Sequence, residues 1–201
     1  MESGEKRALC TKCNRPVKVC ICDALVEIEV PLELIIWQDP TEAKHRLSTA
    51  PLLHLSIKNS RLLVADELSP EDVFNVSDLS QCALLYPLEN GQQLQADQQS
   101  QVKKLLVLDG TWKKVRRLFH LNPWLKTLPY IQIMPESLSR YTIRKSPRSD
   151  GLSTIEAAVT ALNMIDSSRD YQPVLNVLDR MVELQQQYTS AQRNCSRNNV
   201  P

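Results

Sequence analysis

Five short apolar runs limit what this chain can fold into more than any other feature of its sequence. Each run is five or six residues long, and none alternates strictly between apolar and polar residues. This pattern is typical of strands that are covered on both faces, as in a parallel sheet with helices on either side. The runs predict an α/β domain with a mostly parallel sheet and strands at residues 32–37, 61–65, 82–86, 104–108 and 130–134.

Helix signals lie between and after these runs. Ser69 stands before Pro70, which places a capping residue and a proline at the positions that helix starts favour. Ser153 and Glu156 have the spacing of a capping box, in which each side chain satisfies a backbone N–H of the first turn. Apolar residues at helical spacing predict a further helix at residues 49–57, and residues 171–193 are expected to form a long terminal helix that is rich in glutamine toward its end.

Residues 90–101 (NGQQLQADQQSQ) form a polar stretch of low complexity between the third and fourth runs. Such composition offers little apolar surface to bury. We therefore expect an exposed spacer here.

Four cysteines lie close together near the amino terminus, as a C-x-x-C pair and a C-x-C pair. Four thiolates at this spacing are typical of a structural zinc site, which leaves no open coordination position for a substrate. Two disulfides are the competing reading, and the lack of a secretory signal disfavours them. The predicted zinc ligands are Cys10, Cys13, Cys20 and Cys22.

Charge is distributed unevenly although the net charge is only +1. Residues 23–100 contain 13 acids and 4 bases, whereas residues 103–148 contain 2 acids and 11 bases. A cluster of cations of this density is typical of a surface that faces a polyanion. A basic face that only contacts solvent is the simpler alternative.

A carboxylate, Asp109, ends the fourth apolar run. Ligands of open α/β sheets bind beyond the carboxyl ends of the strands, so this residue is placed to act on one. Gly110 permits a sharp turn and close backbone approach, Thr111 can cap the next helix, and Trp112 begins it. That helix carries cations at i, i+3 and i, i+4 spacing, namely Lys113, Lys114, Arg116 and Arg117.

Glycine is scarce, with only four residues in the chain, and neither a P-loop nor a G-x-G-x-x-G motif is present. The chain therefore cannot form a glycine-lined dinucleotide site. A nucleotide-like cofactor would have to be held in another way.

At this point the sequence resembles the DTW-domain family of tRNA-uridine aminocarboxypropyltransferases. The similarity lies in DGTW at residues 109–112, LYP at 85–87, YTIRKSP at 141–147 and LSTIEA at 152–157, and it covers residues 10 to about 165. The segment WQDPTEAKHRLSTAPLL, residues 37–53, is similar to a further family stretch. There Asp39 stands where the family usually has histidine. Just before Thr49, Leu47 and Ser48 stand where the family usually has another residue followed by asparagine. The cysteines resemble the zinc knuckle of bacterial members.

The resemblance implies a fold related to the knotted SPOUT methyltransferases, with a zinc-binding segment at residues 1–24, a catalytic domain at 25–195 and a tail at 196–201. It also implies transfer of the 3-amino-3-carboxypropyl group of S-adenosylmethionine to N3 of a tRNA uridine, in the variable loop by similarity to bacterial members. Methylthioadenosine is the expected by-product, S-adenosylmethionine the co-substrate, Zn²⁺ a structural ion and tRNA the partner.

The resemblance and the residue chemistry together assign the site. Asp109 and Trp112 are the expected catalytic residues: Asp109 as base or as orienter of the cofactor's amino group, and Trp112 as a wall beside the methyl group, a stacking surface or plain core. Arg144 is expected to bind the cofactor carboxylate, and Glu156 or Asp109 its ammonium. The cofactor site is expected at Leu85, Pro87, Leu108, Asp109, Gly110, Thr111, Arg144, Leu152, Ser153, Thr154 and Glu156. The tRNA phosphates are expected at Lys113, Lys114, Arg116, Arg117, Arg140, Lys145 and Arg148, and the zinc knuckle can add a surface for the tRNA.

Two other functions stay open on the sequence alone. One is an S-adenosylmethionine-dependent RNA methyltransferase of related fold, and the other is a zinc-bearing RNA-binding module without catalysis. No apolar stretch approaches the ~18 residues that span a bilayer. We therefore expect a cytoplasmic protein without membrane contact, and a monomer.

Overall fold

A five-stranded sheet lies at the centre of the protein. The structure, a computed structural model, describes residues 8–88, 91–134, 139–143 and 151–197, with side chains up to residue 190. All strand pairings in the sheet are parallel, in the order β2-β1-β4-β3-β5. The strands are β1 (Glu33–Gln38), β2 (Ser60–Val64), β3 (Cys82–Leu85), β4 (Lys104–Asp109) and β5 (Tyr130–Ile131). The α/β class and the parallel sheet are confirmed, and the relation to the SPOUT-like knotted fold stays a prediction.

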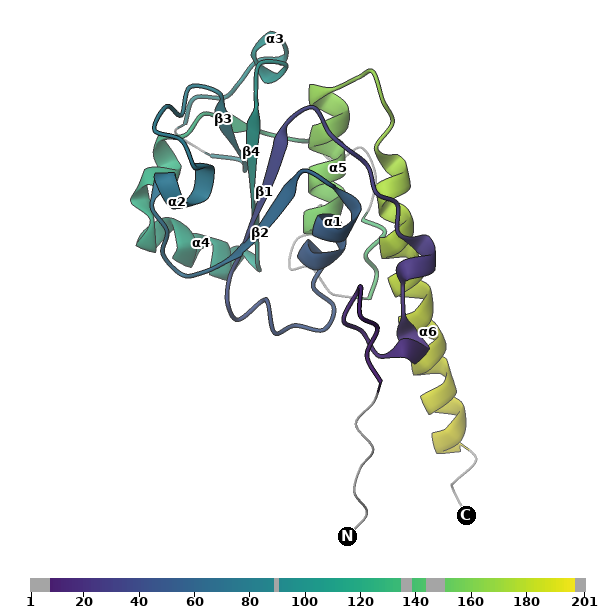
Figure 1. Cartoon of the computed structure of the whole chain (residues 1–201). Helices are drawn as coiled ribbons and strands as arrows, with labels where there is room; N and C mark the ends of the chain where they lie inside the picture. The colour runs from purple at the N-terminus through teal and green to yellow at the C-terminus, as the bar shows by residue number, and fades with distance from the viewer. Residues whose placement is uncertain (1–7, 89–90, 135–138, 144–150, 198–201) are drawn as a thin grey trace.

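Helices cover both faces of the sheet and make three layers (Figure 1). One face packs against α1 (Ala50–Ser56), α5 (Thr154–Ile165) and α6 (Asn176–Arg197), and the other against α2 (Pro70–Phe74) and α4 (Trp112–Leu121). The short α3 (Ala96–Gln99) precedes β4. Short 3₁₀ helices complete the chain: η1 (Val17–Val19), η2 (Cys22–Ala24), η3 (Pro123–Thr127) and η4 (Gln172–Leu175).

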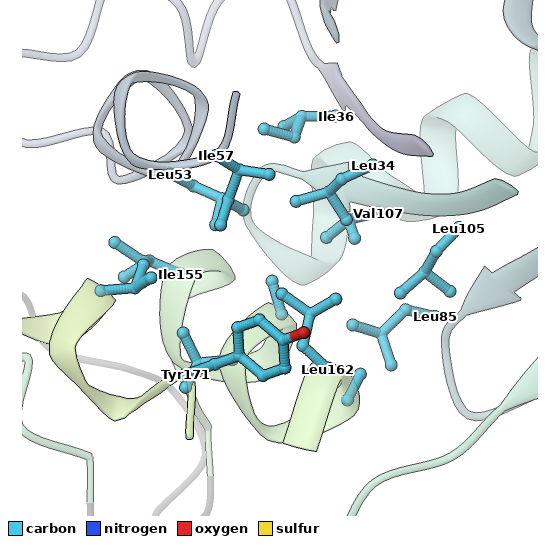
Figure 2. Close-up of a cluster of buried hydrophobic side chains, with 14 of the residues drawn as sticks. Leu34, Ile36, Leu53, Ile57, Leu85, Leu105, Val107, Ile155, Leu162 and Tyr171 are labelled. Atoms are coloured by element: carbon cyan, nitrogen blue, oxygen red, sulfur yellow. The ribbon is translucent and has the colours of Figure 1, made fainter. Parts of the chain in front are cut away.

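Alternation along each strand divides the core into two clusters. Leu34 and Ile36 of β1 point to the face of α1 and α5, whereas Ile35 and Trp37 point to the face of α2 and α4, because successive strand residues face opposite sides of a sheet. Figure 2 shows the first cluster, where Tyr171 joins the aliphatic side chains. Burial on both faces explains why the runs do not alternate between apolar and polar residues.

Most predicted elements are confirmed to within one or two residues. Ser69 and Ser153 occupy the capping positions of α2 and α5, each with a capping box. β5 is shorter than predicted: it ends at Ile131, and Met134 at the end of that apolar run is exposed and adds nothing to the core. The terminal helix begins with the 3₁₀ turn η4, which contains Pro173, and continues as α6.

The expectation of an exposed spacer at residues 90–101 was wrong in part. Leu94 is buried, and its backbone N–H donates to the carbonyl of Tyr130 at 2.9 Å. The buried Gln99 side chain donates to the carbonyl of Leu94 at 3.0 Å. One leucine and one amide therefore attach this polar segment to the sheet edge at β5.

The amino-terminal cysteine knuckle (residues 8–24) packs beside α6 (Figure 1). Ile21 is fully buried in the first core cluster, and Arg180 of α6 forms an ion pair with Asp23 at 3.3 Å. None of the helices in the described part of the chain is long and apolar enough to cross a membrane.

Candidate active site between β1 and β4

Strand order places a topological switch point in the middle of the sheet, which is where open α/β sheets form a crevice for ligands. The chain leaves β1 toward β2 at one edge and leaves β4 toward β5 at the other, although β1 and β4 are neighbours. Adjacent strands whose connections diverge form a topological switch point, where open α/β sheets bind ligands. Gln38 and Asp109 are register partners at the carboxyl ends of these two strands.

The Asp109 carboxylate is buried at this switch point and accepts hydrogen bonds from three segments of the chain. Its Oδ2 accepts from Gln38 Nε2 at 2.7 Å and from Ser48 Oγ at 3.4 Å. Its Oδ1 accepts from the hydroxyl of Thr154, in the first turn of α5. Gln38 Nε2 also donates to Ser48 Oγ at 2.7 Å. Segments that are far apart in the sequence thus fix the orientation of one carboxylate, which is 4 % exposed.

The residues that follow Asp109 take the local roles that the sequence predicted. Thr111 caps α4, since its hydroxyl accepts from the N–H of Lys114 at 3.4 Å. Gly110 lets two segments approach closely, because an added Cβ would lie 3.1 Å from Lys114 Cβ and 3.6 Å from Asp39 Cβ. Its φ is not positive, so the glycine is needed here for space.

Trp112 contributes to an aromatic cluster at the carboxyl end of β3. Its ring centroid lies 5.8 Å from that of Tyr86, and the Tyr86 ring lies 4.7 Å from Phe119. Offset and tilted ring pairs at such distances are favourable beyond their buried area. Trp112 is half-buried, so packing and a wall of the crevice are both compatible with its place.

Two buried acids on the loop after β1 face the basic helix α4. Glu42 forms an ion pair with Lys114 at 2.9 Å, and Asp39 forms one with Arg117 at 3.4 Å. The other Asp39 oxygen accepts the backbone N–H groups of Thr41 and Glu42. Asp39 thus closes the turn of this loop and links it to α4.

The predicted phosphate contacts divide into paired and exposed cations. Lys114 and Arg117 pair with the acids above, and Arg117 also pairs with Asp66 at 2.6 Å, which lowers the pKa of Asp66. Arg140 pairs with Asp179 at 3.2 Å. Lys113 and Arg116 are exposed on α4. Two further predicted phosphate contacts, Lys145 and Arg148, lie outside the described residues, as does Arg144 of the predicted cofactor site.

The remaining predicted cofactor residues surround the carboxyl edge of the sheet or begin α5. Glu156 is buried and accepts from the Ser153 N–H at 2.8 Å, the Ser139 hydroxyl at 2.7 Å and the Arg140 N–H at 2.6 Å. It therefore joins the start of α5 to the segment before it. Leu85 and Leu108 are buried strand ends, Pro87 is exposed, and Leu152 is half-buried.

The four predicted zinc ligands come together. Their sulfur atoms all lie within 4.8 Å of one another, with 3.6 Å between Cys10 and Cys22 and 3.8 Å between Cys13 and Cys20. Sulfurs at ~2.3 Å from a tetrahedral zinc would be about 3.8 Å apart, whereas a disulfide needs ~2.05 Å. The backbone N–H groups of Cys13 and Lys12 lower the pKa of the Cys10 thiol to about 6, and burial raises the pKa of the Cys22 thiol to about 12. The donor set fits zinc.

The sequence left the role of Gln38 open, although its segment resembles a family motif, and Gln38 was not among the predicted site residues. Its amide is 1 % exposed and contacts Asp109 directly. The signal was present, because Gln38 is a polar residue that ends an apolar run, as Asp109 does, on what proved to be the neighbouring strand. Ser48 was noted only as a departure from the family pattern, and it too lies against the carboxylate.

The sheet and the buried polar residues at its switch point define an α/β protein with a candidate ligand site at the carboxyl ends of parallel strands and with a four-cysteine knuckle. Residues 7–186 match the DTW domain, and the chain belongs to this family.

The chain is similar to curated proteins that are named tRNA-uridine aminocarboxypropyltransferases. The chain is 30 % identical over 179 residues to tRNA-uridine aminocarboxypropyltransferase 2 of Drosophila melanogaster, covering 85 % of this chain and 71 % of the relative. It is 29 % identical over 185 residues to the protein of that name from Mus musculus, covering 87 % and 62 %. It is 25 % identical over 222 residues to tRNA-uridine aminocarboxypropyltransferase A of Arabidopsis thaliana, covering 93 % and 84 %. No solved structure matches the chain.

Proposed function

We propose that this protein is a tRNA-uridine aminocarboxypropyltransferase, which transfers the 3-amino-3-carboxypropyl group of S-adenosylmethionine to N3 of a tRNA uridine. The names of its relatives support the reaction class. The observation that carries the proposal is the buried Asp109 carboxylate of the DTW motif, held at the switch point of the sheet. A site of this kind suits a cofactor-sized ligand.

The proposed reaction forms one bond and breaks another. Uridine N3 bonds to the terminal carbon of the aminocarboxypropyl chain, and the bond from that carbon to sulfur breaks with its electron pair left on sulfur. The products are the modified uridine and neutral methylthioadenosine, and the proton of N3 goes to a base or to water. Because the sulfonium also carries a methyl group, the site must hold the correct carbon in line with N3, which is a matter of positioning.

The hydrogen bonds of Asp109 favour an orienting role over that of a general base. Both carboxylate oxygens accept from neutral side-chain donors, Gln38 and Thr154 among them. These donors hold the carboxylate in one orientation, which is what binding of an ammonium group at a fixed position requires. We assign Asp109 to the ammonium group of the transferred chain, with the half-buried Trp112 as the wall of the crevice.

S-adenosylmethionine is proposed to lie across the carboxyl ends of β3 and β4 and the start of α5. Backbone and side chains of Leu85, Pro87, Leu108, Gly110, Thr111, Leu152 and Ser153 would line it. Two carboxylates of this region, Asp109 and Glu156, have different proposed roles. Glu156 already accepts several hydrogen bonds within the protein, so it is assigned to shaping the pocket. Arg144 remains the proposed partner of the cofactor carboxylate.

For tRNA, the exposed cations of α4 are the strongest candidates. Lys113 and Arg116 can reach phosphates without giving up an ion pair to the buried acids of the β1 loop. Lys114 and Arg117 already form ion pairs with Glu42 and Asp39, so a phosphate would have to compete with these acids for the two cations. Arg140, Lys145 and Arg148 complete the proposed surface. A zinc ion held by the four cysteines would order the knuckle beside it.

Location and assembly are also part of this proposal. Four free thiols arranged for metal suit a reducing compartment such as the cytoplasm. A monomer is proposed, with residues 1–24 as a metal-binding segment, 25–195 as the catalytic domain and 196–201 as a tail.

The test is to incubate the purified protein with unmodified tRNA and S-adenosylmethionine and to identify the released nucleoside and the mass gained by uridine. We expect methylthioadenosine and an aminocarboxypropyl adduct, both lost in Asp109→Ala. Adenosylhomocysteine with a methyl adduct would make the protein a methyltransferase instead. Salt-sensitive tRNA binding without any turnover would make it a binding module, and either result would overturn the proposal.

A further inference from the structure

The loop between β1 and α1 brings Ser48 to Asp109, and it is held from three sides. Gln38 donates to the Ser48 hydroxyl at 2.7 Å. The hydroxyl of Tyr141, from the segment before α5, donates to the backbone carbonyl of Leu47. The third contact comes from the cysteine knuckle, where Arg15 Nη2 donates to the backbone carbonyl of Arg46 at 3.0 Å. Three consecutive residues are thus attached to three different parts of the protein.

Arg15 is itself fixed by the part of the knuckle that the cysteines order. It lies between Cys13 and Cys20, and its backbone carbonyl accepts from the N–H of Cys10 at 2.8 Å. Asn14 before it adopts a left-handed conformation with φ of 54°. The direction in which the Arg15 side chain leaves the knuckle therefore depends on the closed turn between the cysteines.

The Arg15 side chain leaves the knuckle along a half-buried path. The same Nη2 that reaches Arg46 lies 2.8 Å from the sulfur of Met181 on α6, which is 1 % exposed. Burial lowers the pKa of Arg15, although an arginine stays charged at any ordinary pH. A planar guanidinium between two fixed partners holds its geometry better than the flexible ammonium of a lysine does.

We propose that Arg15 is a positioning residue for aminocarboxypropyl transfer, through which the cysteine knuckle fixes the loop at residues 46–48 and with it Ser48 against Asp109. This inference rests on the proposed function and deepens it. The knuckle then does more than stabilise the fold, because its metal-dependent order reaches the carboxylate in a short chain of contacts: Arg15 to Arg46, two residues along the backbone to Ser48, and Ser48 to Asp109. A misplacement of about 1 Å at a reacting group can cost up to about 100-fold in rate.

Three variants of the full-length, zinc-loaded protein test the kinetic side. Arg15→Met removes the donors and keeps most of the aliphatic stem, and Arg15→Lys keeps the charge. Lys12→Met is the matched control, since Lys12 is a knuckle cation whose ion pair with Glu27, at 2.6 Å, does not involve the loop. We expect kcat to fall about tenfold in Arg15→Met, less in Arg15→Lys, and less than twofold in Lys12→Met. Zinc content, KM for tRNA and the salt dependence of tRNA binding should stay at their wild-type values.

Other patterns would overturn the proposal. An unchanged kcat would make Arg15 a packing residue. A loss confined to KM for tRNA, with a shallower salt dependence, would make it a phosphate contact. Loss of zinc from both Arg15→Met and Arg15→Lys would make it a part of the knuckle alone.

Hydrogen exchange of the peptide that covers residues 45–49 gives a readout independent of turnover. In the wild type we expect zinc chelation to speed exchange of this peptide by about threefold or more, and Arg15→Met to do the same with zinc bound. Chelation should add little in Arg15→Met, because two changes that break one linkage are not additive. Equal effects of chelation in both proteins would refute the linkage. If the wild type turned over no tRNA, the proposed function would fail while this measurement still decided the role of Arg15.

Discussion

Replacing Gln38 by Met removes two hydrogen bonds from the centre of the site while nearly preserving side-chain volume. The amide of Gln38 is 1 % exposed and donates to Asp109 Oδ2 and to Ser48 Oγ, each at 2.7 Å. In the variant, the carboxylate keeps the hydrogen bonds from the Thr154 hydroxyl and from Ser48 at 3.4 Å. A buried carboxylate then loses a neutral donor that lies 2.7 Å from one of its oxygens.

The magnitude follows from the charge of the acceptor. A hydrogen bond to a charged group contributes about 1.5–3 kcal/mol. If the hydrogen bond from Gln38 stabilises the ground state and the transition state equally, its loss leaves kcat unchanged and appears only as lower stability, with a Tm lower by roughly 3–12 °C. If the orientation of Asp109 matters only during transfer, the same energy lowers kcat by about 10- to 150-fold. We expect both effects, with the larger in kcat, because the bond sets the direction of the carboxylate.

Thermal unfolding and steady-state turnover of Gln38→Met measure the two effects on one preparation. Gln101→Met is the control, since Gln101 is exposed, its amide has a local contact with Ser100 at 3.4 Å, and it precedes β4, whereas Asp109 ends that strand. A Gln38→Met protein with wild-type Tm and wild-type kcat would show that Asp109 does not depend on this donor, and the account of the site would be wrong.

Three further predictions concern the surface, the knuckle and the core. Replacing Lys113 and Arg116 together by Ala should lower the slope of log affinity for tRNA against log salt by about 1.4–1.8. Lys58→Ala, at the opposite edge of the sheet just before β2, should leave it unchanged, and equal slopes for both proteins would exclude α4 from the interface. Zinc chelation should lower Tm by about 5 °C or more, and chelation should have no further effect in Cys13→Ser. A Tm that does not change on zinc chelation would mean that no metal orders the knuckle. Burial and the hydrogen bond to Asp166 raise the pKa of Tyr171 from 10.0 to about 12, so its contribution to stability is complete below pH 10.0 and is lost as pH rises toward 12. Tyr171→Phe should flatten this alkaline loss in urea titrations, and a loss as steep as in the wild type would refute the assignment.

The sequence contained enough to predict the elements but not their order. The five strands were found because each is a short apolar run buried on both faces, and Ser69 and Ser153 marked helix starts by capping chemistry that acts within one turn. The order of the strands depends on long-range packing, which no local pattern encodes. Leu94 was missed because one leucine in a polar stretch carries almost no periodic signal.

Parts of the candidate site could be predicted where they depend on residues that are neighbours in the sequence. They were missed where they depend on contacts between distant segments. Asp109, Thr111 and the four cysteines are recognisable from neighbours within a few residues. The pairing of Lys114 with Glu42 joins residues 72 positions apart, so the cations of α4 looked equally available for phosphate. Arg15 gave no signal, because its contact is with a backbone carbonyl 31 positions away, and backbone acceptors look alike in any sequence.

The central claim is that the aminocarboxypropyl carbon, and not the methyl carbon, is attacked at the crevice of Asp109. The most direct test supplies tRNA and enzyme with S-adenosylmethionine labelled either in its carboxyl group or in its methyl group. The account predicts that the carboxyl label enters tRNA in the wild type and is reduced at least 100-fold in Asp109→Asn, while the methyl label stays with the released nucleoside. Methyl label in tRNA, or undiminished transfer by Asp109→Asn, would contradict it.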